Sequence, residues 1–204
     1  MKERESNVLS LLEDKTNIYA RKIALGMKTQ FGWKELTYDG LGLMSRRLAA
    51  YLMNDLGIQR GEKLAILSES KPEYGVCVFA SVISGLITVP LDIKLTKYEL
   101  HSVMLVSQSY IDKALELQKV IPSLKHIIVM DEHPVNENLQ SIYTIPNNYT
   151  CKWRHRSRKS VVFIIYTSGT TGNPKGVETT FGNMLAQLKD LKTAFNQILP
   201  YGDV

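Results

Sequence analysis

The chain has 204 residues, of which 44% are apolar and 22% are charged. This length allows one domain or two small ones, and the composition excludes a largely disordered chain. Cys77 and Cys151 are too few for a disulfide scaffold, and the charged start at Met1–Ser6 leads into no apolar run long enough for a secretory signal. We therefore expect a reducing, cytoplasmic setting, in which peripheral contact with a membrane stays open.

The net charge of +5 comes from one segment. Five cations and no acid occur within eight residues: Lys152, Arg154, Arg156, Arg158 and Lys159. Without them, 20 of the 25 basic residues remain against 20 acidic residues, so the rest of the chain has no net charge. This disfavours a protein that binds polyanions over its whole surface. The segment could contact phosphates of nucleic acid or lipid, although a solvated linker explains it more simply.

The first part of the chain alternates predicted helices and strands. Residues 6–14 are typical of a short amphipathic helix, and residues 22–25 and 29–33 are typical of short strands. A helix then opens at Tyr38, and Gly57 is well placed to end it in a left-handed conformation. The apolar residues of this helix recur at steps of three and four: Leu41, Met44, Leu48, Leu52 and Leu56.

An uncharged run from Tyr74 to Leu91 follows a predicted buried strand at residues 63–68. The run is as long as the shortest membrane-spanning helices, but Gly, Ser, Thr and Pro interrupt it. We therefore expect a buried helix at residues 72–84, a left-handed Gly85 and a buried strand at residues 86–90. The capping-box pattern Thr96-Lys-Tyr-Glu99 predicts the start of a further helix.

The second part of the chain predicts two more strands and a helix. Residues 126–130 form an apolar strand, and the Asn- and Pro-rich residues 131–150 predict a loop. Residues 161–166 are apolar on both faces, as expected in the middle of a covered sheet. One apolar stripe predicts an amphipathic helix at 179–198. The alternation indicates an α/β fold with a mixed or parallel sheet flanked by helices.

The connection between that last strand and helix carries the most chemical information. It reads Tyr166-Thr-Ser-Gly-Thr-Thr-Gly-Asn-Pro-Lys-Gly176. Glycines let successive backbone N–H groups turn toward one anion, hydroxyls add donors, and a lysine adds a full positive charge. A polar surface turn would use some of the same residues, but this density favours a polyphosphate-binding loop. The spacing is not that of a Walker A motif, which disfavours a P-loop kinase or GTPase.

These eleven residues resemble the signature loop of the AMP-forming, adenylate-forming enzymes, a family that includes acyl-CoA synthetases, luciferases and the adenylation domains of peptide synthetases. The resemblance extends upstream, through Trp33-Lys-Glu-Leu-Thr-Tyr38, Gly61-Glu-Lys-Leu-Ala-Ile-Leu67, Lys71-Pro-Glu73 and Val89-Pro-Leu-Asp92. The stretch Pro122-Ser-Leu-Lys-His-Ile-Ile-Val-Met-Asp131 looks most like the long-chain fatty acid–CoA ligase branch. The match runs from about residue 20 to the end of the chain.

The resemblance implies a two-step reaction. A carboxylate, here of a long-chain fatty acid, attacks the α-phosphate of Mg²⁺–ATP to give an acyl-adenylate and pyrophosphate. The thiol of coenzyme A then takes the acyl group and releases AMP. By resemblance, seven residues grip the β- and γ-phosphates: Thr167, Ser168, Gly169, Thr170, Thr171, Gly172 and Lys175. No metal site is expected, because the His and acidic residues near His126 and His133 match no standard ligand spacing.

The sequence also departs from the family pattern. It ends at Val204, before the family's adenine, ribose, hinge and C-terminal lysine motifs and before the small mobile domain. We therefore expect residues 1–204 to be the N-terminal portion of an AMP-binding domain, with a loop or linker at 132–159. The passage at 103–108 is short, so either the preceding helix is clipped or a strand is lost. Glu178 and Phe181 replace what is often an apolar residue and a histidine.

Three hypotheses about function follow. The first is an acid–thiol ligase. This chain would carry the phosphate-binding loop of that enzyme and would be inactive alone. The second is a non-catalytic remnant or a nucleotide-phosphate-binding module. The third and weakest is nucleic-acid binding through Lys152–Lys159.

Overall fold

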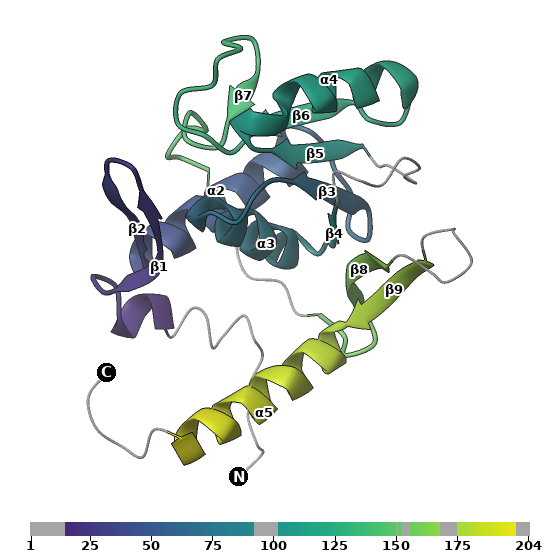
Figure 1. The fold of residues 1–204 in the computed structure, drawn as a ribbon. Helices are drawn as coiled ribbons and strands as arrows, with labels where there is room; N and C mark the ends of the chain where they lie inside the picture. The colour runs from purple at the N-terminus through teal and green to yellow at the C-terminus, as the bar shows by residue number, and fades with distance from the viewer. Residues whose placement is uncertain (1–14, 92–101, 150, 152–155, 168–174, 199–204) are drawn as a thin grey trace.

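A computed structural model describes residues 15–91, 102–149, 151, 156–167 and 175–198. Two predicted helices, at residues 6–14 and from Thr96, lie outside the described residues. Within them, the chain forms a two-stranded sheet and a seven-stranded sheet with helices on both faces (Figure 1). The predicted α/β fold is confirmed.

The chain begins with an antiparallel hairpin that leads into a helix. Strands β1 (Ile23–Thr29) and β2 (Gly32–Thr37) are the two short strands expected from sequence, each longer than predicted. The hydroxyl of Thr37 accepts a hydrogen bond from the Gly40 N–H at 3.2 Å and so caps helix α2 (Tyr38–Asn54). Gly57 has the predicted positive φ, 65°, just beyond the helix.

The uncharged run folds as predicted. Strand β3 (Lys63–Leu67) is followed by α3 (Pro72–Ser84), then by Gly85 at φ 81°, and then by β4 (Ile87–Pro90). No helix in the described part of the chain is long and apolar enough to span a membrane.

The passage at 103–108 keeps its strand. Val103–Val106 forms β5, four buried residues that pair in parallel with β3, so the expectation that a strand might be lost is wrong. A short 3₁₀ turn, η1 (Gln108–Tyr110), then leads into α4 (Ile111–Val120), a helix that the sequence reasoning missed. Strands β6 (His126–Val129) and the two-residue β7 (Gln140–Ser141) follow, the latter inside the predicted loop.

The last elements are β8 (Val161–Thr167), β9 (Lys175–Thr180) and helix α5 (Phe181–Ile198). The large sheet has the order β7-β6-β5-β3-β4-β8-β9, and all neighbours are parallel except β9, which is antiparallel to β8. The carboxyl ends of β3 to β8 therefore lie along one edge of the sheet.

Alternate residues of the central strands enter two different cores. On one face, Leu64 and Ile66 of β3 pack with α2, α3 and the first residue of α5. On the other, Ala65 and Leu67 pack with α4. Burial on both faces is why these strands are nearly continuous apolar runs.

Strand β8 does not lie in the middle of a covered sheet, as its sequence suggested. It is the second strand from the edge, and Ile165 is 47% exposed, although Val162 and Ile164 are buried. The apolar run correctly predicted a strand but not its position: β9 pairs beside β8 at the edge of the sheet, and α5 runs away from the two strands (Figure 1).

Candidate phosphate-binding hairpin

The structure places both ends of the predicted phosphate loop. Thr167 is the last residue of β8 and Lys175 the first of β9, and the two are paired in the antiparallel register. The Thr167 hydroxyl donates to the Lys175 carbonyl at 3.5 Å, and both residues are exposed. The other five predicted residues, Ser168, Gly169, Thr170, Thr171 and Gly172, lie outside the described residues.

The loop connects two strands, not a strand and a helix as the sequence reasoning expected. Lys175–Thr180 forms β9 because it alternates with β8 across a six-pair antiparallel register and contains the β-branched residues Val177, Thr179 and Thr180. Helix α5 therefore starts at Phe181, six residues after Lys175. Its N-terminal dipole is separated from the phosphate loop by the whole length of β9.

The start of α5 is capped by hydrogen bonds between Thr180, the residue before the helix, and Asn183 in its first turn. The Asn183 side-chain oxygen accepts from the Thr180 N–H at 3.0 Å, and the Thr180 hydroxyl accepts from the Asn183 N–H at 3.2 Å. Phe181 is buried in the core and its N–H donates to the Ser160 carbonyl at 2.8 Å. The aromatic ring at this position therefore anchors the helix to the base of β8.

Arg156 holds the base of β8 to the rest of the sheet. Its guanidinium donates to the carbonyls of Gly85 and Leu86, each at 3.2 Å, and of Val161 at 3.1 Å. The side chain is only 4% exposed, so the interpretation of 152–159 as solvated is wrong for this residue. Burial, with a contribution from the positive charge of Arg60, lowers the pKa of Arg156 to about 10, which leaves it charged at neutral pH.

Sequence reasoning missed a second polar group at the carboxyl edge of the sheet. Lys71 pairs with Asp131 and approaches Glu69 at 3.8 Å. Ser107 donates to Glu69 at 2.6 Å, and the Gln108 N–H donates to Asp131 at 2.7 Å. These residues follow β3, β5 and β6, whose carboxyl ends share an edge with that of β8. The lysine is satisfied by two carboxylates, so the cluster ties the strand ends together.

A buried carboxylate fixes the loop after β7. The Tyr143 hydroxyl donates to Glu73 at 2.5 Å, and Lys34 forms an ion pair with the same carboxylate. The second oxygen of Glu73 is buried and has no hydrogen-bond partner among the described residues. Burial, reinforced by this hydrogen bond, raises the pKa of the Tyr143 hydroxyl well above its ordinary value.

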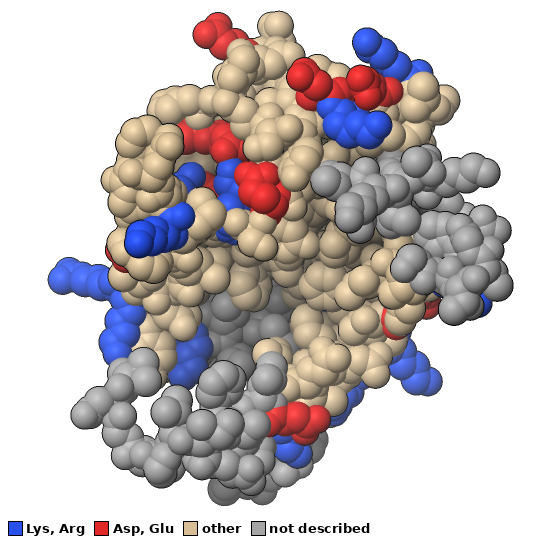
Figure 2. All heavy atoms as spheres, viewed as in Figure 1, with Lys and Arg blue, Asp and Glu red and all other residues tan. Residues whose placement is uncertain are grey.

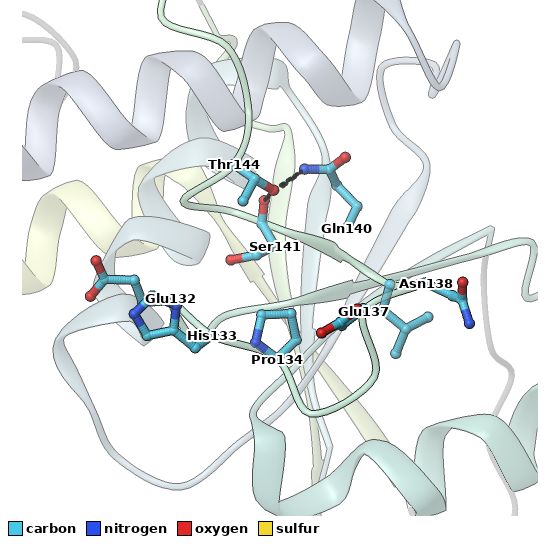
Figure 3. A pocket seen from close by; sticks show the side chains of 9 residues that line it. Glu132, His133, Pro134, Glu137, Asn138, Gln140, Ser141 and Thr144 are labelled. Atoms are coloured by element: carbon cyan, nitrogen blue, oxygen red, sulfur yellow. Dashed lines mark hydrogen bonds between the residues drawn. The ribbon is translucent and has the colours of Figure 1, made fainter.

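A polar pocket lies at the other edge of the sheet. A pocket of about 490 Å³ is formed by the loop after β6 and by β7 (Figure 3). Across its upper wall the Gln140 amide donates to the Thr144 hydroxyl at 2.6 Å. Because β7 and β9 are the two edge strands of the seven-stranded sheet, this pocket is not part of the phosphate hairpin. Its wall is polar: Glu132, His133, Pro134, Glu137, Asn138, Leu139, Gln140, Ser141 and Thr144.

A parallel sheet whose carboxyl edge carries a loop rich in glycine and hydroxyl residues is typical of nucleotide-binding α/β domains. The chain belongs to the AMP-binding enzyme family, which matches residues 12–204. This confirms the family resemblance of the signature loop and of the upstream segments.

Individual relatives agree with this assignment. The human long-chain-fatty-acid–CoA ligase ACSBG1 is 27% identical over 186 residues, which cover 81% of this chain and 25% of that protein. The solved structure of the anthranilate CoA ligase AuaEII with anthranoyl-AMP is 26% identical, with a TM-score of 0.73 over 89% of this chain and 36% of that chain. A red-emitting luciferase from Phrixothrix hirtus shares the fold, with 21% identity and a TM-score of 0.73 over 83% of this chain and 44% of its own. The chain thus spans a quarter to under a half of these proteins.

Proposed function

We propose that this chain supplies the phosphate-binding hairpin for ATP-dependent activation of a carboxylic acid, of the long-chain fatty acid class. The observation that carries the proposal is the sequence 166–176 set between β8 and β9 at the carboxyl edge of the sheet. In the whole reaction, the acid's carboxylate attacks the α-phosphorus of ATP, pyrophosphate leaves, and an acyl-adenylate forms. Coenzyme A then displaces AMP through its thiol. Mg²⁺ enters with ATP.

The residues of the hairpin have different roles in this proposal. Lys175 stands at the first position of β9, exposed and next to Thr167, where its ammonium can neutralise a β- or γ-phosphate. Ser168, Thr170 and Thr171 supply hydroxyl donors, and Gly169 and Gly172 let backbone N–H groups approach. Since β9 separates α5 from the loop, the positive charge comes from Lys175 and loop N–H groups, with no help from the α5 dipole.

Calorimetric titration with Mg²⁺–ATP tests this role of Lys175. We expect Lys175→Ala to weaken binding at least about tenfold, because it removes a full charge from the phosphate contacts. Lys119→Ala is the matched control, since Lys119 is an exposed lysine on α4. Equal affinities of the parent chain and Lys175→Ala would refute a functional loop.

A second candidate is a phosphate-binding module without catalysis. All seven residues predicted to contact phosphate lie within this chain, whose match covers 25% of the human ligase. Acid-dependent exchange of pyrophosphate into ATP separates the two functions. We expect the 204-residue chain alone to show Mg²⁺–ATP binding without exchange, and measurable exchange would assign the first reaction step to these residues.

Nucleic-acid binding through 152–159 loses support. Arg156 is buried among three carbonyls and cannot reach an external phosphate. A titration with single- and double-stranded DNA at low salt checks this, and binding that disappears with charge reversal at Arg158 and Lys159 would restore the idea.

A further inference from the structure

The β1–β2 hairpin exposes an unusual amount of apolar surface. Phe31, in the turn, is 91% exposed, Trp33 is 67% exposed and Ile23 is 53% exposed. The hairpin forms its own small sheet at one side of the molecule, apart from β8 and β9 (Figure 1). Exposed large apolar residues are common singly, but three on one short hairpin indicate an interaction surface.

The register shows that two of these side chains share one face. Lys28 pairs with Trp33, and Gly26 pairs with Glu35 two positions further, so all four lie on the outer face of the hairpin. A Cβ atom built on Gly26 would lie 3.8 Å from the Trp33 ring and 3.9 Å from the Ile23 side chain. Trp33 and Ile23 therefore lie together around Gly26 as an apolar strip, which the side chain of Glu35 borders.

The opposite face of the hairpin already has its partners. Leu25 and Leu36, paired across β1 and β2, pack against the main core. Folding therefore uses the inner face and leaves the outer strip uncovered by any described residue. Neither Trp33 on the outer face nor Phe31 in the turn is among the residues that form or pack against the two cores.

Cationic side chains outnumber acidic ones at this hairpin. Arg21, Lys22 and Lys28 are all exposed on or beside β1, with Lys28 on the outer face, and Glu35 and Asp39 are the exposed acids nearby. Lys34 points inward to the buried Glu73. Figure 2 shows Lys and Arg side chains gathered at the side of the molecule where the hairpin lies. Aromatic rings flanked by long cationic side chains match the boundary between lipid headgroups and acyl chains.

We propose that the tip and outer face of the β1–β2 hairpin bind an anionic membrane surface. Phe31 and Trp33 enter the headgroup region, and Lys28 and Arg21 lie against lipid phosphates. An aromatic side chain inserted into the interface gains from burial, while each nearby cation adds attraction to an anionic leaflet. The proposal is independent of nucleotide binding, because the hairpin and the phosphate loop are on different strands of different sheets.

Vesicle sedimentation tests the proposal with the 204-residue chain. We expect binding to phosphatidylcholine vesicles containing phosphatidylglycerol, at least about tenfold weaker binding to pure phosphatidylcholine, and weakening with salt. The double variant Phe31→Ser, Trp33→Ser should lose at least about tenfold in partitioning, because two aromatic insertions are removed. Circular dichroism confirms that this variant folds, as expected for two exposed positions.

Fluorescence gives a second readout in the same protein. In a Trp153→Phe variant, Trp33 is the remaining tryptophan. Its emission should shift to shorter wavelength on addition of anionic vesicles, since the ring leaves water. An unshifted emission with bound protein would place the membrane contact elsewhere and overturn the assignment.

Two control variants make the result specific. Leu188→Ser changes an exposed apolar residue of α5, and Val135→Ser changes an exposed apolar residue of the loop after β6. Both should bind anionic vesicles like the parent chain. A loss with Leu188→Ser equal to that of the double variant, equal binding to neutral and anionic vesicles, or no binding by the parent would each refute the proposal. Failure of ATP binding would leave it standing.

Discussion

Replacing Arg156 should weaken the attachment of β8 to the sheet. Arg156→Met keeps an apolar stem and removes the guanidinium, so the carbonyls of Leu86 and Val161 lose a charged donor. The carbonyl of Gly85 keeps the Gly61 N–H at 3.0 Å. The buried Leu86 carbonyl and the part-buried Val161 carbonyl lose this donor, at a cost of about 1–3 kcal/mol each, and relief of the buried charge offsets part of this. We expect a net loss of about 2–3 kcal/mol in the free energy of unfolding.

Urea unfolding followed by circular dichroism measures this loss. Arg158→Met is the matched control, because Arg158 is exposed two residues away and its change should stay within about 0.5 kcal/mol. Equal stability of Arg156→Met and Arg158→Met would refute the view that the buried guanidinium supports β8. A loss of stability in Arg156→Met alone would show that the buried guanidinium stabilises the contact between β8 and the end of α3.

Three further changes test other parts of the fold. Tyr143→Phe should lower the free energy of unfolding by about 1–2 kcal/mol at neutral pH, since Glu73 loses a donor. Because folding raises the pKa of Tyr143, the parent chain should lose this advantage as pH rises above about 10. A difference in urea unfolding that stays the same across that range would contradict the raised pKa. Gly85→Ala should cost about 1–2 kcal/mol in the same assay, because φ is 81° and Arg60 fills the adjacent space. Thiol labelling in native buffer should modify Cys151 and spare Cys77, because Cys77 is fully buried and burial raises the pKa of its thiol. Rapid labelling of both would contradict the packing of α3.

The elements that the sequence predicts most closely, α3, β3 and β4, are those with clear local signals at both ends. Helix α3 begins at Pro72 and ends before Gly85, as predicted, because proline suits a first helical turn and glycine suits the left-handed cap. Strands β3 and β4 were predicted within one residue at each end, since their apolar runs are bounded by polar residues or by glycine. In these cases one short segment contains all the information that its structure needs.

The remaining features depend on contacts between distant segments. Strand β9 is polar and exposed, and only its pairing with β8 makes it a strand. The sequence could show that Arg156 belongs to a basic run but not that carbonyls 70 residues earlier would receive its guanidinium. The phosphate loop stays a prediction, made from the density of glycines, hydroxyls and a lysine at 166–176 and from the resemblance of that stretch to the family's signature loop.

These contacts also explain how the phosphate hairpin keeps its position with little burial of its own. Strand β8 meets the parallel sheet through one registered pair, Thr88 with Phe163, and its outer half is partly exposed. The fixed points are at its base, where Arg156 links it to the end of α3 and Phe181 anchors the following helix. The base of the hairpin is therefore fixed by polar and apolar contacts, while Thr167 and Lys175 at its other end are exposed. The proposed phosphate-binding function suits this arrangement, because the support holds the two strand ends in register and leaves the side chains of Thr167 and Lys175 open to a ligand.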